Sequence, residues 1–206
     1  SGVDLKRFNL VHSPKVFKTE GTRAVRFLLI ARMLWDKGVG EYVNAARVLR
    51  RLFPEGEFCL LGFLDVKNPS AISLSQMNTW VAEGVVCYLG ECDDVRPEII
   101  QADCVVLPSY REGTPRTLLE AAAMGKPIIT TNAVGTREVV EDGINGFLCK
   151  PKNYADLADK MLQMINLSSD QRTAMGKAGR KKMEREFDEK IVIQRYLKVI
   201  QEIVNY

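Results

Sequence analysis

The amino-acid sequence predicts an open, doubly wound, mostly parallel α/β sheet with helices on its faces. Short apolar runs suited to strands occur at residues 24–31, 57–62 and 102–107. Strands of a parallel sheet that is covered on both faces show such continuous runs rather than alternation. Helical patterns lie between these runs, so strands and helices alternate along the chain. Right-handed crossovers would then join the strands into one sheet.

Weaker strand patterns complete the sheet, and each is bounded by Gly, Pro or Asp: residues 85–89, 127–131 and 146–149. The first helix is expected over residues 38–53, where apolar residues recur at steps of three and four. Asp36 stands where an N-cap or a first-turn acid belongs.

A second helix is predicted by its ends. Thr114 is expected as N-cap and Pro115 at the first helical position, and Gly125 is expected to end the helix. The segment between them is small and apolar, which favours close packing on the sheet.

After Pro151 the chain is predicted to be helical to its end. Asn153 would cap one helix, Ser168 with Gln171 would form a capping box for the next, and Asp188 would start the third. The third helix places several apolar residues on one face: Ile193, Tyr196, Leu197, Ile200 and Val204. We expect the three helices to cover one edge and face of the sheet. The basic run at 180–186 is interpreted as a solvated helix face.

Length and composition fit a single domain over residues 1–206. Hydrophobic residues make up 46% and charged residues 27%, which argues against disorder. The net charge of +3 is too small to favour nucleic-acid binding. The sequence shows neither an apolar run of about 20 residues nor a signal-peptide layout.

Histidine and cysteine usage narrows the chemistry. His12 is the single histidine, so a multi-His zinc site is excluded, and we interpret His12 as a surface or packing residue. A metal or redox pair of Cys87 and Cys92 lacks a second pair to complete four ligands. The odd number of cysteines suggests buried free thiols in a reducing cytosol: Cys59, Cys87, Cys92, Cys104 and Cys149.

Two loops after predicted strands carry candidate ligand-binding residues, because ligands of open α/β sheets bind beyond the carboxyl ends of the strands. Arg32 and Lys37 follow the first strand, and residues 108–115 follow the strand at 102–107. Both loops lead into helix N-termini, whose free amides and dipole attract anions. Together they predict a diphosphate site. The alternative is that both cations are surface charges and residues 114–115 only start a helix.

Two acids support the first interpretation. Glu112 precedes the second helix and Glu120 lies inside it, about 12 Å apart if the segment were all helical. This exceeds the roughly 5 to 9.5 Å between the carboxylates of a glycosidase. Separated acids suit hydroxyl groups at the two ends of a nucleotide-sugar. Gly113 would allow close backbone approach, and the amides of Arg116 and Thr117 would be available to phosphate.

At these residues the chain resembles a known family. Glu112 and Glu120 match the E-x7-E motif of retaining nucleotide-sugar glycosyltransferases of the GT-B fold, in the family numbered four. The likeness extends to GVDLKRF, ARMLWDKG, YLGECDD and the block at residues 108–148. It is to the C-terminal, donor-binding half, one Rossmann-like domain, of enzymes that build bacterial capsular or lipid-linked polysaccharide.

The resemblance implies roles for the candidate residues. Arg32 and Lys37 would neutralise the donor diphosphate and Glu112 would act at the transferred sugar, and these three are the expected catalytic residues. Asp94, in the segment 90–94, would lie near the base, and Gly135 would wall the sugar pocket. The remaining donor contacts would come from one loop and helix: Gly113, Thr114 and Pro115 for the sugar, Arg116 and Thr117 for phosphate, and Glu120 for the ribose.

The resemblance also implies a donor, partners and a location. The donor would be a UDP-hexose or another nucleoside-diphosphate sugar, with no metal or other cofactor, and transfer to a saccharide or lipid-linked acceptor would retain configuration. The acceptor-binding N-terminal domain and its catalytic His would be absent, so the chain alone would be inactive. The full enzyme would be a cytoplasmic hexosyltransferase, open to peripheral contact with the inner face of the membrane.

Alternatives of other classes remain. A non-catalytic nucleotide-binding or regulatory module could keep the fold, and a sugar-nucleotide epimerase shares it. A dinucleotide-dependent oxidoreductase is disfavoured, because the turn after the first strand lacks G-x-G-x-x-G spacing.

Overall fold

The computed structural model describes residues 1–10, 24–64 and 66–204. Six parallel strands form one sheet in the order β3-β2-β1-β4-β5-β6. Their bounds are β1 (Arg26–Ile30), β2 (Glu57–Leu61), β3 (Cys87–Tyr88), β4 (Cys104–Leu107), β5 (Ile128–Thr131) and β6 (Gly146–Cys149). All six predicted strands form, and the predicted doubly wound topology is confirmed. The strand order reverses between β1 and β4, where ligands of such sheets bind.

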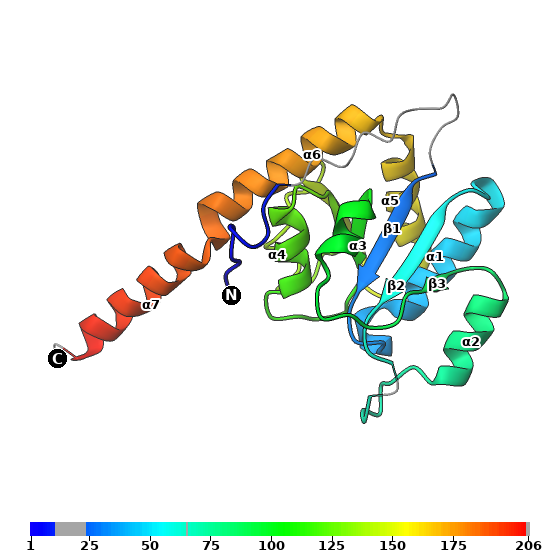
Figure 1. Ribbon diagram of the computed structural model, residues 1–206, viewed down its shortest axis with the longest axis horizontal. Coiled ribbons are helices and arrows are strands. Elements are labelled where there is room, and N and C mark those ends of the chain that lie inside the picture. Colours follow the sequence, from blue (N-terminus) through cyan, green and yellow to red (C-terminus); the bar gives the residue numbers. More distant parts are fainter. Residues whose placement is uncertain (11–23, 65, 205–206) are drawn as a thin grey trace.

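Helices cover both faces of the sheet (Figure 1). Their bounds are η1 (Trp35–Lys37), α1 (Val39–Leu52), α2 (Leu74–Ala82), α3 (Arg96–Gln101), α4 (Arg116–Ala123), α5 (Tyr154–Asn166), α6 (Ser169–Lys182), η2 (Met183–Phe187) and α7 (Glu189–Val204). The helices of the described residues include none with the length and hydropathy of a membrane span.

The middle strands are buried on both sides, which explains their continuous apolar sequences. In β1, Phe27 and Leu29 pack with α1 and α5, whereas Leu28 and Ile30 pack with α3 and α4. Successive side chains of a strand point to opposite faces, so both parities must be apolar here.

Helix ends agree with the sequence except at two positions. Asn153, the Ser168–Gln171 capping box and Gly125 act as predicted. The prediction for α4 was wrong by one residue, because Pro115 is extended and is itself the N-cap in place of Thr114. A proline disfavours the α conformation at the residue before it, so Thr114 lies outside the helix.

The second difference concerns Asp36, which was predicted at the start of α1 but does not cap that helix. It lies in the single turn of η1, and Gly38, with φ of 73°, separates this turn from α1. A side chain on Gly38 would come within 2.1 Å of the carbonyl oxygen of Pro108. Close packing of two loops therefore decides where α1 begins.

The C-terminal helix departs from the expected arrangement. Helices α5 and α6 pack on the sheet or its neighbouring helices, whereas α7 extends away from the body (Figure 1). Its predicted inward residues Ile193, Tyr196, Leu197 and Ile200 are 53–65% exposed. A π-helical segment, η2, and the extended Asp188 redirect the chain between α6 and α7. The prediction that all three helices cover the sheet was wrong for α7.

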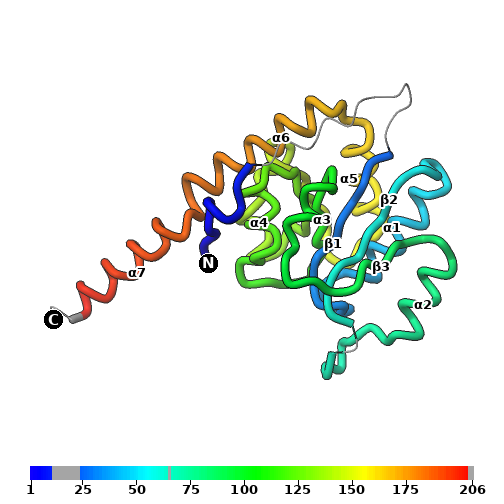
Figure 2. Tube along the Cα trace, viewed as in Figure 1, coloured from blue at the N-terminus to red at the C-terminus, as the bar shows by residue number. Residues whose placement is uncertain are grey.

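The N-terminal segment, residues 1–10, runs beside α4 and the start of α7 (Figure 2). The backbone of Val3 bonds to Phe187 and Glu189 at 2.8 and 3.2 Å. Arg180 is buried and donates to the carbonyl oxygens of Phe8 and Ala123, each at 2.8 Å. Lys182 is also buried and pairs with acids. The basic run 180–186 is therefore not simply a solvated face, because two of its cations fix other segments.

The cysteines divide by burial. All five are free thiols, and Cys59, Cys104 and Cys149 are buried as predicted. Cys87 and Cys92 are exposed, which corrects the prediction for those two. His12 lies outside the described residues.

Candidate functional site

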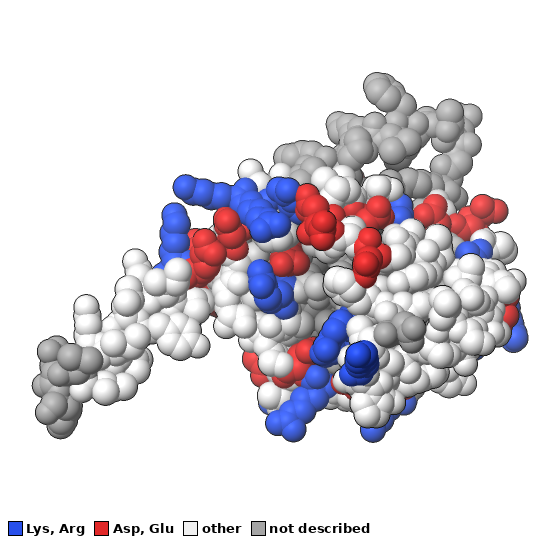
Figure 3. All heavy atoms as spheres, turned by 60° about the horizontal axis from the view of Figure 1, so that its bottom comes forward, with Lys and Arg blue, Asp and Glu red and all other residues white. Residues whose placement is uncertain are grey.

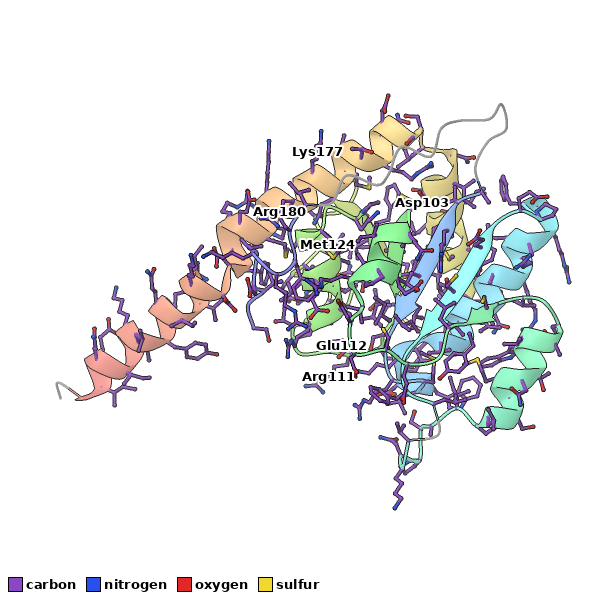
Figure 4. The ribbon with its side chains drawn as sticks, viewed as in Figure 1. Asp103, Arg111, Glu112, Met124, Lys177 and Arg180 are labelled. Atoms are coloured by element: carbon purple, nitrogen blue, oxygen red, sulfur yellow. The ribbon has the colours of Figure 1, made fainter. Side chains whose placement is uncertain are left out.

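The predicted cation Lys37 and the predicted acid Glu112 meet at the carboxyl edge of the sheet. Lys37 Nζ lies 2.6 Å from Glu112 Oε1, and each side chain is 15% exposed. Lys37 ends η1 after β1, and Glu112 lies in the loop between β4 and α4, 75 residues later in the chain. Parallel strands end at a common edge, which explains how such distant residues meet. Figure 4 shows the Glu112 loop at the lower edge of the sheet.

Arg32, the other predicted cation, differs from Lys37. Its side chain is exposed, and it forms no ion pair with another described residue. The charge of Lys37 is compensated within the protein, whereas that of Arg32 is available to a ligand.

The turn after β5 supports the backbone that carries Glu112. Gly135 has φ of 87°, and a Cβ atom there would lie 1.7 Å from the carbonyl oxygen of Gly113 and 2.2 Å from that of Glu112. The amide of Gly135 donates to Glu138 Oε2 at 2.7 Å. The amide of Glu112 donates to the carbonyl oxygen of Val134 at 3.4 Å. Only glycine fits this approach, so Gly135 lies against Glu112 and Gly113.

The start of α4 offers free backbone donors. Pro115 is buried, and Gly113 and Arg116 are exposed. The amides of Arg116 and Thr117 have no hydrogen-bond acceptor among the described residues, as expected for the first helical positions. These amides, with the positive end of the helix dipole, suit an anion.

Glu120 lies one turn further along α4 and borders a cavity of about 190 Å³. The cavity is also lined by Arg116 and by residues of the N-terminal segment and α7, including Arg7 and Glu189. Burial raises the pKa of Glu120, and the charges of Arg116 and Arg7 oppose that shift. Within the described chain, no hydrogen bond reaches its carboxylate.

Arg7 is a neighbour of the site that the sequence did not single out. It borders both this cavity and a second one of about 280 Å³ that also includes Asp94. Its only signal in the sequence was its place within the GVDLKRF segment.

Asp94 is held by Arg96 rather than left free. The guanidinium donates to both carboxylate oxygens, from Nη2 to Oδ2 at 2.7 Å and from Nε to Oδ1 at 2.8 Å. These bonds lower the pKa of Asp94 to about 2. Asp94 is therefore a fixed negative charge beside the second cavity.

Charges of both signs share this side of the molecule. Figure 3 brings the lower edge of Figure 1 forward and shows Lys and Arg interspersed with Asp and Glu, rather than one continuous basic surface. Among the residues that the structure describes, no three His, Cys, Asp or Glu side chains gather as a metal site would require.

Comparison with known proteins identifies the family. The family model described as "Glycosyl transferases group 1" matches residues 15–182. The chain belongs to this family. Its relatives include glycosyltransferases of bacterial polysaccharide biosynthesis, as the resemblance of the motifs predicted.

Two curated relatives illustrate the match. The N,N'-diacetylbacillosaminyl-diphospho-undecaprenol alpha-1,3-N-acetylgalactosaminyltransferase of Campylobacter jejuni is 35% identical over 86% of this chain and 45% of its own length. The capsular polysaccharide biosynthesis glycosyltransferase CapM of Staphylococcus aureus is 25% identical over 93% of this chain and 50% of its own. The chain thus spans about half the length of these relatives.

Solved structures share the fold. Sucrose-phosphate synthase from Thermosynechococcus elongatus superposes with a TM-score of 0.84 at 22% identity, over 99% of this chain and 51% of that one. Anabaena HepE in complex with UDP-glucose gives 0.81 at 22% identity, over 98% of this chain and 56% of that one. These matches confirm the Rossmann-like fold expected for one half of a GT-B glycosyltransferase.

Proposed function

We propose that this chain binds a nucleoside-diphosphate sugar, with UDP-hexose as the favoured donor, as the donor half of a retaining glycosyltransferase. One observation carries the proposal: the Lys37–Glu112 pair sits at the carboxyl edge of the sheet, directly before the helix that presents Glu120. Membership of the family supports it. A uridine nucleotide as the donor is supported by HepE, which has the same fold and was solved in complex with UDP-glucose.

The proposed roles follow from charge and hydrogen bonding. Arg32 and the amides of Arg116 and Thr117 neutralise the diphosphate as it departs, with Lys37 beside them. Glu120 accepts hydrogen bonds from the ribose hydroxyls, because its carboxylate borders a cavity and has no bond to a described residue. Gly113, Thr114 and Pro115 shape the sugar pocket, and Asp94 lies towards the base.

Glu112 is proposed to orient the sugar rather than to attack it. Its Oε1 is held by Lys37, and no described residue bonds to Oε2, which leaves that atom for a sugar hydroxyl. Attack by the acceptor on the face from which the diphosphate leaves would retain configuration without a covalent intermediate. The proposal needs no metal ion.

The acceptor and its binding site belong to the longer protein in this proposal. A saccharide or lipid-linked acceptor is supported by the diphospho-undecaprenol in the name of the Campylobacter relative. An acceptor-binding N-terminal domain would supply what this chain lacks, at the cytoplasmic side of a membrane. The chain alone is expected to bind donor weakly and to transfer no sugar, and measurable transfer by it would contradict this.

Calorimetric titration with UDP, GDP and ADP tests the donor site. Arg32→Ala and Glu120→Ala should each weaken nucleotide binding by about tenfold, the effect of losing a charge-assisted hydrogen bond of about 1.5 kcal/mol. Lys177→Ala is the matched control, because Lys177 is an exposed lysine on α6, far from Glu112 (Figure 4). If the site variants bind as the wild type does, the motif serves packing and the proposal fails.

A further inference from the structure

Three buried hydroxyl groups connect the loops that form the candidate site. They belong to Ser109, Thr131 and Thr136, whose side chains are all 0% exposed. We call these three residues the hydroxyl clasp. None of them was singled out by the sequence, since Ser and Thr at strand ends are common.

Each hydroxyl of the clasp donates to a backbone carbonyl oxygen. Ser109 Oγ donates to Asp36 at 3.1 Å, and Thr131 Oγ1 donates to Ser109 at 2.5 Å. Thr136 Oγ1 lies 2.8 Å from the carbonyl oxygen of Thr131 and 3.0 Å from that of Ala133. The bonds therefore run in series from the loop after β5, through the loop after β4, to the loop after β1.

The clasp is adjacent in sequence to the groups that form the site. Asp36 precedes Lys37, Ser109 lies three residues before Glu112, and Thr136 follows Gly135. A backbone bond from Tyr110 to Asp36, at 3.0 Å, reinforces the first connection. Besides the Lys37–Glu112 ion pair, buried bonds that involve none of these side chains thus hold the backbone at Lys37, Glu112 and Gly135 in place.

Buried hydroxyls at these positions need a reason, because valine has nearly the same shape as threonine. A valine would leave buried carbonyl oxygens with fewer partners, at a cost of about 1–3 kcal/mol for each unsatisfied group. The threonines therefore serve the loops rather than the core.

We propose that the hydroxyl clasp is a positioning device for the transferred sugar: it fixes the backbone of Glu112 and Gly113 against the turn at Gly135. This inference rests on the proposed function. The clasp lies at the sugar end of the site and touches neither the amides assigned to phosphate nor Glu120. Its loss should therefore affect the sugar moiety of a donor more than the nucleotide.

Thr130 provides a matched control. It is also 0% exposed, and its hydroxyl donates to the carbonyl oxygen of Leu107 at 2.7 Å. That bond joins β5 to β4 within the sheet and holds no loop. Thr130→Val removes a buried hydroxyl of the same kind as Thr136→Val, and Thr136→Ser keeps the hydroxyl.

Hydrogen–deuterium exchange tests the positioning directly and needs no ligand. The amides of Tyr110 and Glu112 report the loop, since both are bonded to neighbouring loops. They should exchange about fivefold faster in Thr136→Val than in Thr130→Val, which is the effect of losing a hydrogen bond of about 1 kcal/mol. Thr136→Ser should match the wild type. Equal exchange in the two valine variants would overturn the proposal.

Titration with UDP and with UDP-glucose or UDP-N-acetylgalactosamine tests the consequence for binding. Thr136→Val should weaken the binding of the sugar nucleotide about fivefold and leave the binding of UDP unchanged, whereas Thr130→Val should change neither affinity. An equal loss for UDP and its sugar would overturn the selective role. A wild-type chain that binds no nucleotide would instead contradict the proposed function, and the exchange comparison would still decide whether the clasp orders the loop.

Discussion

The two ends of the candidate site are held in different ways. At the end that we propose holds the sugar, which we call the sugar end, Lys37 and Glu112 form a largely buried pair, and Gly135 lies against the neighbouring backbone. At the end that we propose holds the nucleoside, which we call the nucleoside end, Glu120 and Arg7 border a cavity of about 190 Å³. No described residue forms a hydrogen bond with the carboxylate of Glu120, and burial raises the pKa of this group.

The two ends differ in how completely their polar groups are bonded within the protein. Buried hydrogen bonds to backbone carbonyls leave the sugar end with one geometry, because every displaced partner would be unsatisfied. At the nucleoside end the carboxylate of Glu120 is kept partly buried with no hydrogen-bond partner in the described part of the chain, at a cost in stability. The sugar end is preformed, and the nucleoside end is open for a ligand to complete.

Gly135→Ala should give the largest effect and break the sugar end. The left-handed backbone and the contact with two carbonyl groups predict a loss of about 3–5 kcal/mol in the free energy of unfolding, measured with urea. Gly113→Ala is the control, since a Cβ there meets nothing within 4 Å. It should change stability by less than about 0.5 kcal/mol. If Gly135→Ala lowered the free energy of unfolding no more than Gly113→Ala does, the turn at Gly135 would have to rearrange to accept a side chain.

Breaking the Lys37–Glu112 pair should give the next largest effect. Lys37→Ala or Glu112→Gln should each lower the free energy of unfolding by about 1–3 kcal/mol, between the values for surface and fully buried pairs. The double variant Lys37→Ala with Glu112→Gln should lose less than the sum of the two, as a double-mutant cycle would measure. Strict additivity would mean that the two side chains do not interact.

Glu120→Gln should raise the free energy of unfolding, whereas Glu112→Gln should lower it, which sharpens the comparison of the two ends. Because burial raises the pKa of Glu120 above its usual 4.5, the ionised form is disfavoured in the folded state. The resulting loss of folding stability is fully present above the raised pKa. It disappears as the pH falls through 4.5, because Glu120 is then protonated in both the folded and the unfolded protein.

The variant should therefore unfold at a higher urea concentration than the wild type at pH 7 and at nearly the same concentration below pH 4.5. Its nucleotide affinity should fall. A loss of stability at pH 7 would mean that the carboxylate has a partner in the folded protein.

The smallest effect concerns Asp94, at the edge of the open end. The Arg96 guanidinium lowers the pKa of Asp94 to about 2. Arg96→Ala should return it towards the usual 3.8, as a carboxyl carbon NMR titration would show. Arg51→Ala, which removes an equal charge from an exposed position on α1, should leave the titration unchanged. An unaltered midpoint in Arg96→Ala would mean that other charges hold it low.

Much of the site could be predicted from sequence because its residues stand in local patterns. Glu112 and Glu120 are spaced by one loop and one helical turn, and Lys37 follows the first strand. The sequence could not show that Lys37 and Glu112 bond to each other, since 75 residues separate them. Nor could it show Arg7 near Glu120, because the N-terminal segment is held beside α4 by bonds to α6 and η2, which lie far along the chain.

The sequence by itself determined the elements: the six strands and most helix ends. These depend on apolar periodicity and on capping, which involve residues a few positions apart. Tertiary structure decided which surfaces are covered, including the exposed apolar side of α7, the burial of Arg180 and Lys182, and the clasp behind Glu112. Burial and long-range hydrogen bonds depend on which segments meet in space, and periodicity within one segment carries no information about its partner.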